Sequence, residues 1–331
     1  MMKYINNGSI NPFYNLALEE YVLKNCSNDD NYFILWQNEP TVVVGKYQNT
    51  SGEINADFIE RNSINVVRRI TGGGSVYHDL GNINFSFISK YLDEELLDFN
   101  KFTVPVIYSL DKLKIHAELS GRNDILIDGK KISGNSQHIY KDRILHHGTL
   151  LFDSDIENVM KALHVDEDKI ISKGIKSIRS RVANIRDYLD SDMAVEEFKK
   201  ILLRSVFEYS NSLVIEYKLS GRDVAEIKSI MKNKYETWGW NYGESPRGNY
   251  RNSKRFKGGK IEVSLNIEKG LIEECKIQGD FLGTLDICEI ERKIRGIRYE
   301  IHEIDKFLSS LDVRKYFGTI SREELKNCFI S

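Results

Sequence analysis

The 331-residue sequence has few of the features that mark secreted and membrane proteins. Its four cysteines are scattered and none forms a C-x-x-C pair, so neither a disulfide framework nor a metal cluster is expected. No run approaches the roughly 18 apolar residues of a membrane span, and the first residues lack the apolar core of a signal peptide. We therefore expect a protein of a reducing cytoplasm, with no membrane partner.

An excess of charge of one sign is also missing. The formal net charge is −2 with 29% charged residues, which argues against wholesale nucleic-acid binding but leaves room for a local basic patch. The composition is otherwise that of an ordinary globular protein, and a chain of this length suffices for about two domains with a sizeable core.

Apolar patterning predicts sheet elements up to about residue 152, with helices beside them. Strands are predicted over 32–36, 41–44, 64–67, 124–128, 130–140 and 144–152. Helical spacing predicts one helix that begins at Asn11-Pro12 and three further helices over 102–119, 193–209 and 221–232. The predicted fold class is α+β, with a large mixed sheet flanked by helices and a small α+β domain at the carboxyl end.

The composition changes over residues 243–260, which hold six basic residues. We interpret this stretch as a linker or exposed connection. The chain then divides into a large domain at 1–245 and a small domain at 246–331. Residues 261–277 follow as a hairpin with one wet face, because apolar and polar residues alternate there.

The most distinctive stretch is RRITGGGSVYHDLGNINFSF at residues 68–87. The three glycines at 72–74 lack Cβ atoms, so the backbone there can reach positive φ, approach a ligand closely and cradle an anion. Arg68 and Arg69 alternate in direction, so one of them can aim a bidentate fork at phosphate or carboxylate. The spacing matches neither a P-loop nor G-x-G-x-x-G. A glycine-rich hairpin with an exposed arginine pair is the alternative.

Two further stretches carry groups suited to phosphate chemistry. Asp124 begins a strand and could help to hold a divalent cation beside phosphates, or it is a plain turn aspartate. Lys131 alternates with Ile132, so if Ile132 faces the core, Lys131 faces the other side of the sheet and can offset charge on a reacting phosphate. A solvated hairpin lysine is the alternative.

The adjacent histidines His146 and His147 lie on a predicted strand and therefore point in opposite directions. One of them is expected to face a pocket, although a strand histidine is more often structural. Nucleophilic catalysis finds little support, because no cysteine lies in these stretches and no G-x-S-x-G elbow is present. Charge stabilisation and positioning are the expected work of the site.

These motifs, in this order and spacing, resemble the lipoate–protein ligases. The resemblance rests on RRITGGGSVYHDLGNINFSF, GRNDILIDGKKISGNSQ, RILHHGTLLF and KGIKSIRSRVANI. GDFLG and IERKIRGIRYE resemble that family's small accessory domain, so the likeness covers nearly the whole chain.

The resemblance implies a catalytic domain of the biotin/lipoate ligase type and a small domain that swings relative to it. It implies two steps: lipoate and ATP, with Mg²⁺, give lipoyl-AMP and pyrophosphate, and a lysine of an acceptor then takes the lipoyl group as an amide. The implied acceptors are the lipoyl domains of 2-oxoacid dehydrogenase E2 subunits or the glycine cleavage H protein, with no nucleic acid involved.

The resemblance also implies roles for single residues. Lys131 is the implied catalytic residue and contacts both the α-phosphate and the lipoyl carboxylate. Asp124 is the candidate metal ligand, but on its own chemistry and not on the resemblance. The implied ATP-binding residues are Arg69, Gly74, Ser75, Val76, Tyr77, Asn82, Lys131 and Arg181. The implied lipoate-binding residues are Gly72, Gly73, Lys131 and His147. The basic segment at 173–181 matches a loop that closes over the adenylate.

Two other functions stay open at this stage. An acyltransferase of the same fold would move octanoyl or lipoyl groups between carrier proteins and would favour a thiol near the pocket, yet Cys26 is the only cysteine before residue 275. A nucleic-acid or protein-binding module would use the basic residues at 247–260 with Tyr250 and Phe256. In a milder form, that stretch steers an acidic acceptor domain.

Overall fold

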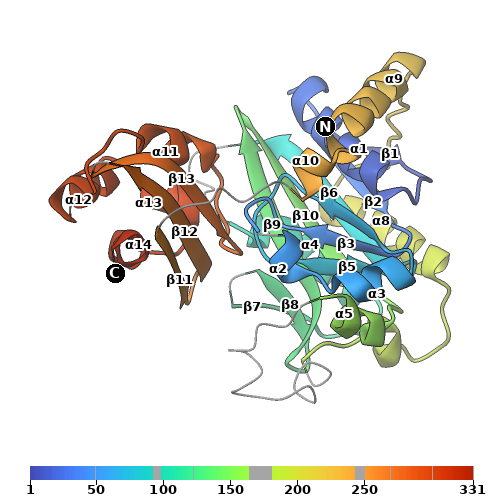
Figure 1. The fold of residues 1–331 in the computed structure, drawn as a ribbon. Helices are drawn as coiled ribbons and strands as arrows, with labels where there is room; N and C mark the ends of the chain where they lie inside the picture. The colour runs from blue at the N-terminus through green and yellow to red at the C-terminus, as the bar shows by residue number, and fades with distance from the viewer. Residues whose placement is uncertain are drawn as a thin grey trace.

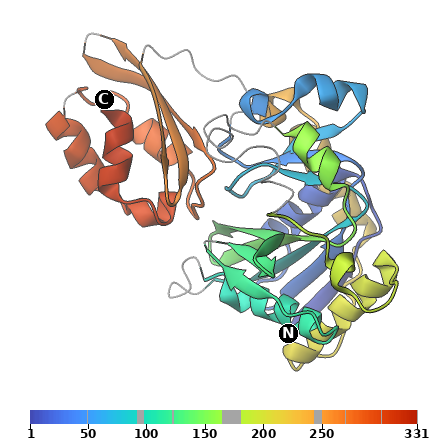
Figure 2. The ribbon, with the colours of Figure 1, turned by 90° about the horizontal axis from the view of Figure 1, so that it is seen from below.

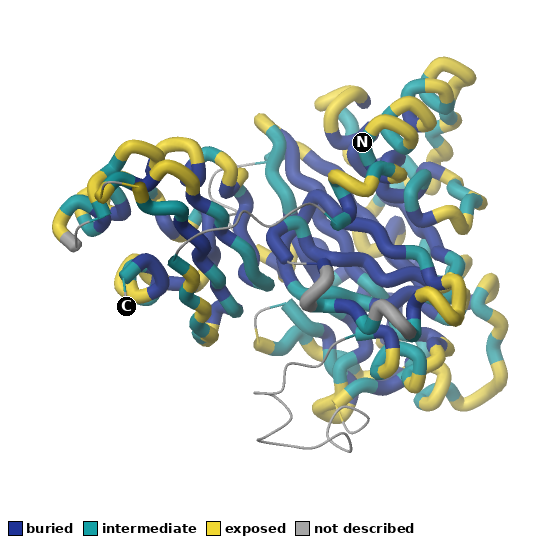
Figure 3. The backbone as a smooth tube through the Cα atoms, viewed as in Figure 1, coloured by how far each residue is buried: buried dark blue, intermediate teal, exposed yellow. Residues whose placement is uncertain are grey.

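The computed structural model describes residues 1–48, 50–91, 98–121, 123–163, 181–242, 250–268, 270–299 and 301–330. A large part contains a seven-stranded sheet and a three-stranded sheet, and a smaller carboxyl-terminal part contains another three-stranded sheet (Figure 1). Figure 3 shows buried backbone running along the strands of both parts. The predicted α+β class, with a large mixed sheet and a small second sheet, is therefore confirmed.

The large sheet has the strand order β1-β2-β6-β10-β9-β8-β7. It is mixed, because β1 runs parallel to β2 whereas the other neighbours are antiparallel. The strands are β1 Met2–Asn6, β2 Asn31–Trp36, β6 Asn82–Lys90, β7 Glu118–Ser120, β8 Asp124–Ile127, β9 Lys130–Tyr140 and β10 Arg143–Leu151. Asp128 and Gly129 both have positive φ, 49° and 73°, at the β8–β9 turn, as a two-residue hairpin requires.

The two faces of the large sheet differ because side chains alternate along each strand. One face carries Phe85, Phe87 and Ile144 and packs in one core with residues of α4 (Asn100–Asp111) and α8 (Val195–Tyr209). The other face carries Ile34, Ile88 and Leu145, which pack against α1 (Pro12–Asn25). Asn84, Ser86 and His147 share this second face and lead to the candidate site.

Helix α1 begins as the sequence predicts. The side chain of Asn11 accepts a hydrogen bond from the backbone N–H of Tyr14 at 3.0 Å, and Pro12 occupies the first helical position. Asn15 and Glu19, four residues apart, are both only 1% exposed. The helix therefore buries polar side chains against the sheet, and these side chains take part in the site.

The predicted helix over 102–119 is wrong at its carboxyl end. α4 ends at Asp111, and residues 118–120 form β7 instead. Lys114 adopts φ of 61°, and the N–H of Ile115 returns to the carbonyl of Leu110 at 3.0 Å. This turn closes the helix although apolar residues continue at helical spacing beyond it.

A second sheet, in the order β4-β3-β5, lies over the site. Its strands are β3 Thr41–Val44, β4 Asn65–Arg68 and β5 Val76–His78, with β4 parallel and β5 antiparallel to β3. Val42, Val44 and Tyr77 pack in a core of their own with nearby helix residues. The neighbouring helices are α2 Thr50–Glu53, α3 Ala56–Arg61 and α5 Ile156–Ala162.

The last segment of the large part returns to α1 and to β4. It comprises α9 Gly221–Ile230, the π-helical turn η3 Met231–Tyr235, and α10 Trp238–Asn241, whereas η2 Ile185–Tyr188 precedes α8 and packs in the core of the opposite face. Lys234 and Tyr235 place polar atoms 2.7 and 2.6 Å from Oε2 of Glu20. Within the described part of the chain, no helix has the length and apolar character needed to cross a membrane.

The carboxyl-terminal part is an antiparallel sheet in the order β11-β12-β13 with helices on one face. The strands are β11 Tyr250–Phe256, β12 Gly259–Glu268 and β13 Leu271–Gly279, and the helices are α11 Cys288–Lys293, α12 Ile301–Ser309, α13 Val313–Phe317 and α14 Arg322–Phe329. The helices lie on the side of this sheet that faces away from the large part (Figure 2). Ile261, Val263 and Leu265 form the buried row of β12, so the predicted hairpin is confirmed.

The linker prediction for residues 243–260 is wrong over most of its length. Residues 250–256 pair along β12 as the edge strand β11, and β12 itself begins at residue 259. Residues 243–249 lie outside the described chain. Basic residues misled the prediction because an edge strand exposes every second side chain, as β11 does at Arg251, Ser253 and Arg255.

Candidate active site

The glycine loop, residues 72–74, is held from below by Arg69. Arg69 is 6% exposed and donates from Nη2 to the carbonyls of Gly72 and Gly74 at 2.6 and 2.8 Å. Its Nε donates to Thr71 at 2.9 Å and its Nη1 to the carbonyl of Val43 at 3.2 Å. Arg69 therefore does not offer the free bidentate fork that the sequence predicts, because its guanidinium donates to the loop and to its neighbours.

Arg68 points to the opposite side of β4, as alternation predicts. It is 7% exposed and donates to the carbonyls of Gly45 and Gln48 at 2.9 and 2.7 Å. Its Nε also donates to the carbonyl of Trp240 at 3.0 Å. The alternative of an exposed arginine pair is therefore wrong, and burial lowers the pKa of Arg68 and Arg69 to about 10.

The sequence predicts that a ligand can approach the glycine backbone closely. In the structure, residues of the carboxyl-terminal part make such an approach. The N–H of Gly73, which has φ of 91°, donates to the carbonyl of Phe281 at 3.1 Å. A Cβ on Gly72 would lie 2.6 Å from that same carbonyl oxygen. Tyr47, beside the loop, stacks on Phe281 and donates to the carbonyl of Leu285 at 2.9 Å.

A cavity of about 230 Å³ opens beneath this loop, between the two sheets of the large part. Among its lining residues, Leu16 and Trp36 are buried apolar side chains, whereas the side chains of Lys131 and Asp124 are partly exposed to solvent. The lining residues are Leu16, Trp36, Val43, Arg69, Gly73, Gly74, Ser75, Val76, His78, Asn84, Asn123, Asp124, Lys131, Gly134, Asn135, Ser136, His147, Gly148, Thr149 and Asp280.

Lys131 faces the cavity as its alternation with Ile132 predicts. Ile132 is fully buried in the core of the opposite face, and Lys131 Nζ lies 2.8 Å from Oδ1 of Asp124. The backbone N–H of Lys131 donates to the carbonyl of Arg181 at 2.6 Å, and Ala183 donates back to Lys131 at 3.1 Å. The rest of the basic segment, residues 173–180, lies outside the described chain.

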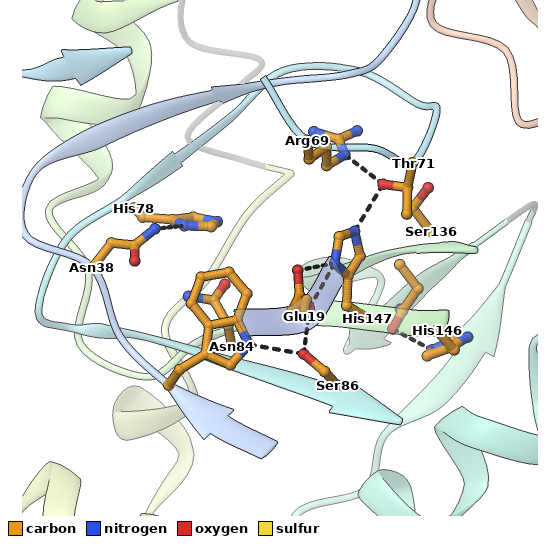
Figure 4. A network of polar contacts seen from close by, with 12 residues as sticks. Glu19, Asn38, Arg69, Thr71, His78, Asn84, Ser86, Ser136, His146 and His147 are labelled. Carbon is orange, nitrogen blue, oxygen red and sulfur yellow. Dashed lines mark hydrogen bonds and ion pairs between the residues drawn. The ribbon is translucent and has the colours of Figure 1, made fainter. Parts of the chain in front are cut away.

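A buried chain of hydrogen bonds joins α1 to the glycine loop (Figure 4). Glu19 lies 3.0 Å from Nδ1 of His147, and Nε2 of His147 lies 2.8 Å from the hydroxyl of Thr71, which in turn accepts from Arg69. Ser86 donates to Glu19 at 2.5 Å. The chain fixes the orientation of His147 and, through Thr71, the position of Arg69.

The two histidines divide as the sequence predicts. His147 lines the cavity, whereas His146 is fully buried on the other face and stacks on Phe85 and Phe102. Glu19 was missed by sequence reasoning. The available signal was a pair of polar residues, Asn15 and Glu19, four apart on a helix that is otherwise apolar on several sides.

The remaining predicted ATP-binding residues are only partly gathered at the cavity. Ser75 and Val76 line it, and the hydroxyl of Ser75 donates to Oε1 of Gln48 at 2.9 Å. The side chain of Tyr77 packs on the other face of the small sheet, away from the cavity. Asn82 is fully buried and does not line the cavity. Its side chain donates to Oδ1 of Asn84, a lining residue, at 3.0 Å.

The described residues offer few groups at the cavity for metal binding or for thiol catalysis. Among the described residues, no group of three or more His, Cys, Asp or Glu side chains is placed to hold a metal ion. Asp124 contributes one carboxylate, and its Oδ1 is already at Lys131. None of the four free cysteines belongs to the cavity lining, which removes the thiol that the acyltransferase alternative would favour.

Comparison with known proteins assigns the family. Residues 11–207 match the family model of the lipoyl protein ligase A/B catalytic domain, and residues 245–329 match that of the bacterial lipoate protein ligase C-terminus. The chain is 50% identical over 325 residues to the lipoate–protein ligase LplJ of Bacillus subtilis, with 98% of each chain covered. The chain belongs to the lipoate–protein ligase family. The resemblance inferred from the motifs is thereby confirmed.

Other lipoate–protein ligases are similar over the same range. Lipoate–protein ligase 1 of Staphylococcus aureus is 45% identical over 325 residues, again with 98% of each chain covered. The structure of P. falciparum LipL1 in complex with lipoate shares the fold, with a TM-score of 0.82, 24% identity and 98% of each chain covered.

Two further solved ligases match the larger part of the chain. A lipoate–protein ligase A bound with ATP has a TM-score of 0.64 and 27% identity over 73% of this chain and 98% of that chain. A bipartite lipoate protein ligase of Thermoplasma acidophilum, described with its E2 lipoyl domain, has a TM-score of 0.66 and 28% identity over 75% of this chain and 98% of that chain. The cavity described above is therefore the candidate active site of a lipoate–protein ligase.

Proposed function

We propose that this chain is an ATP-dependent lipoate–protein ligase that works in two steps. Lipoate and ATP first give lipoyl-AMP and pyrophosphate, and the lipoyl group then passes to a lysine of an acceptor protein. The observation that carries the proposal is the position of Lys131, a partly exposed cation that lines a pocket together with buried apolar side chains such as Leu16 and Trp36. Solved structures of similar ligases are described as bound with ATP in one case and in complex with lipoate in another.

In the first step, a lipoate carboxylate oxygen attacks the α-phosphorus of ATP, and the bond to pyrophosphate breaks. Both reactants are anions, so their approach is opposed by charge repulsion. Lys131 lies between them in the proposed complex, donates hydrogen bonds to both and offsets that repulsion. It is a charge-stabilising residue and not a covalent nucleophile.

We assign ATP to the glycine loop and β5. Gly74, Ser75 and the backbone of Val76 and Tyr77 bind the nucleotide, with Val76 beside the adenine. Asn82 supports this wall through Asn84, and Arg69 acts by holding the loop carbonyls in place. We assign Arg181 to the nucleotide as well, and the hydrogen bond from the backbone N–H of Lys131 to its carbonyl supports this assignment.

A magnesium ion fits this site as a partner of the nucleotide. The described residues offer Asp124 as one carboxylate ligand and no larger cluster, so phosphate oxygens would complete the coordination, as is usual for Mg²⁺. When bound, the ion would supply positive charge beside the phosphates. Asp124 would in that case exchange its contact with Lys131 for the metal.

Lipoate is assigned to the cavity between the two sheets. Lys131 binds its carboxylate, Gly72 and Gly73 form the roof, and His147 lines the wall where Glu19 fixes its orientation. Burial of the lipoyl group in the cavity keeps water from the mixed anhydride until the acceptor arrives. In the second step, the acceptor amine attacks the acyl carbon, AMP leaves, and the amine loses its proton to solvent.

We propose that the chain divides into a catalytic domain at 1–245 and an accessory domain at 246–331 that moves during the cycle. The contact between Phe281 and Gly73 supports this movement, because it occupies a loop N–H that faces the nucleotide site. Asp280 lines the same cavity, and a Cβ on Gly74 would lie 3.9 Å from its Cβ, so phosphates bound at this loop would repel its carboxylate. The accessory domain must therefore withdraw before the nucleotide is fully seated.

The proposed acceptors are lipoyl domains of 2-oxoacid dehydrogenase E2 subunits or the glycine cleavage H protein. The description of a related ligase together with its E2 lipoyl domain supports this class of partner. A reducing cytoplasmic setting is proposed as well, because the four cysteines are free thiols.

Incubation with ATP, magnesium and lipoate, without acceptor, tests the proposal. Mass analysis should find lipoyl-AMP bound to the protein and stoichiometric pyrophosphate. A folded protein that releases no pyrophosphate with any eight-carbon acid would overturn the proposed function. Transfer from an acylated carrier protein without ATP would instead support the acyltransferase alternative.

A further inference from the structure

A break in strand register lies next to Lys131. In the pairing of β8 with β9, Ile125 lies opposite Ser133. The next residue of β8, Leu126, lies opposite Lys131. Ile132 is therefore an extra residue of β9 with no partner on β8, which makes this a β-bulge. Bulges change the direction in which nearby side chains point, so this one bears on where Lys131 points.

The bulge turns two consecutive side chains of β9 into the core that includes α4 and α8. Ile132 packs there with Ile125, and both are fully buried. Ser133 lies opposite Ile125, so it points to the same face, and it is fully buried as well. With plain alternation, Lys131 and Gly134 would lie on opposite faces of the sheet, because they are three residues apart. The bulge brings both to the cavity, which they line together.

The side chain of Lys131 lies across the backbone of Gly134. A Cβ added at Gly134 would lie 3.0 Å from Nζ and 3.1 Å from Cε of Lys131. The next nearest atom is Oδ1 of Asp124 at 3.9 Å, and this oxygen lies 2.8 Å from the same ammonium. The missing side chain therefore leaves room over β9 for the charged end of the lysine.

The backbone conformation at Gly134 does not itself require glycine. Its φ lies outside the left-handed region, unlike that of Gly73. The three atoms nearest to its added Cβ all belong to the side chains of Lys131 and Asp124. The lack of a side chain at Gly134 therefore matters to the lysine and its carboxylate partner, and not to the packing of the strands.

The backbone around the bulge is held from several sides. The N–H of Gly134 donates to the hydroxyl of Thr149 on β10 at 3.2 Å. The N–H of Lys131 donates to the carbonyl of Arg181 at 2.6 Å, and the carbonyl of Lys131 accepts from Ala183 at 3.1 Å. Because the backbone is fixed in this way, the place of the ammonium is set by the side-chain torsions of Lys131 and by the space over Gly134.

We propose that Gly134 is a positioning residue for the first step of the reaction. Its lack of a side chain, brought to the cavity face by the bulge, sets the place of the Lys131 ammonium. The inference rests on the proposed function, in which that ammonium contacts a carboxylate and the α-phosphate at once. A side chain at Gly134 would move the ammonium away from Asp124. A misplacement of about 1 Å can lower a reaction rate about a hundredfold.

The test is Gly134→Ala, which adds one methyl group. The methyl meets the flexible end of a partly exposed side chain, so thermal unfolding should be unchanged. The kcat/KM for pyrophosphate release with ATP, magnesium and lipoate should fall at least about tenfold. Gly8→Ala is the matched control and should keep the wild-type rate, because a Cβ at Gly8 meets nothing within 4 Å.

A double variant separates positioning from a structural effect. In a Lys131→Ala protein, the added methyl no longer meets the lysine, so Gly134→Ala should cause no further loss in single-turnover pyrophosphate release. A similar loss in both backgrounds overturns the inference, and so does a wild-type rate in Gly134→Ala. If Gly134→Ala alone does not fold, the double variant should fold, and its failure to fold overturns the inference too. A wild-type protein that releases no pyrophosphate contradicts the proposed ligase function itself.

Discussion

The ammonium nitrogen of Lys131 lies 2.8 Å from Oδ1 of Asp124, and the two side chains are 37% and 36% exposed. Without substrates, the cation that is proposed to join two anions is thus already paired with a carboxylate. The pair is accessible to solvent, so it contributes little to folding and can be exchanged for substrate oxygens at small cost. Substitution at Lys131 should therefore affect chemistry and not stability.

Lys131→Ala should lower the rate of lipoyl-AMP formation by more than about a hundredfold, because a charge that stabilises the transition state is removed. Lys130→Ala is the control, since Lys130 is exposed and lies outside the cavity lining. Pyrophosphate release measures the rate, and thermal unfolding checks the fold. Equal losses in both variants would show that the wrong lysine had been assigned.

Gly73→Val should block ligand loading. Gly73 has φ of 91°, and a Cβ there would lie 3.0 Å from Nη2 of Arg69 and 3.1 Å from Leu282. The strain should shift the loop over the cavity and weaken lipoate and ATP binding by at least about tenfold. Calorimetric titration measures both affinities, with Gly8→Val as control, because an added Cβ at Gly8 meets nothing within 4 Å. Normal adenylate formation in the Gly73 variant would contradict the predicted block.

Reversal of charge along β11 should slow the encounter with an acidic acceptor domain. Arg251, Lys254 and Arg255 lie on this edge strand, and steering by exposed charges acts on the association rate. Changing all three to Glu should lower that rate several-fold at low salt and less at high salt. Lys114→Glu, at an exposed turn of the large part, is the control. An unchanged association rate would remove this strand from the docking surface.

Glu20 should be a source of acid sensitivity. Burial raises the pKa of Glu20, but Lys234, Lys24 and Tyr235 outweigh it and lower the value to about 2 from 4.5. Because the folded-state pKa is the lower one, this stabilisation is complete above about pH 4.5 and is lost as the pH falls towards 2. Unfolding by urea between pH 6 and pH 3 should show a smaller decline for Glu20→Gln than for the wild type.

At pH 7, Glu20→Gln should lower the free energy of unfolding by about 1 to 3 kcal/mol, because it removes a buried carboxylate from two lysines. Glu226→Gln is the matched control. Glu226 pairs with Arg222 at 3.0 Å, and the arginine side chain is 87% exposed, so the loss there should be below about 0.5 kcal/mol. Similar losses in the two variants would show that burial does not matter to the pair.

Local sequence signals predict much of this fold. Asn11-Pro12, Asp128-Gly129 and the alternation of Lys131 with Ile132 each follow from chemistry within a few residues, and each is found in the structure. Local signals failed where a neighbour in space decides the outcome. The basic composition of residues 250–256 suggests a linker, and only their pairing with β12 shows that they form the strand β11.

The candidate site shows the same division. Lys131, His147 and the glycines could be predicted because their residue types and spacing carry chemistry of their own. Glu19 could not, because it gains its role from a contact with His147 that joins two elements distant in the chain, α1 and β10. Arg69 was placed correctly at the loop but given the wrong partners, since sequence does not reveal that loop carbonyls use its donors.

The short segment at 234–241 has a consequence for how the chain can be shortened. The carbonyls of Asn241 and Trp240 accept hydrogen bonds from Arg68 on the opposite side of β4 from Arg69, and Lys234 pairs with Glu20 on α1. A truncation at residue 207, where the match to the catalytic family model ends, would remove these partners and uncover the apolar side chains of α1 that Ile227 and Tyr235 pack against. A catalytic fragment of this ligase should therefore extend at least to Asn241.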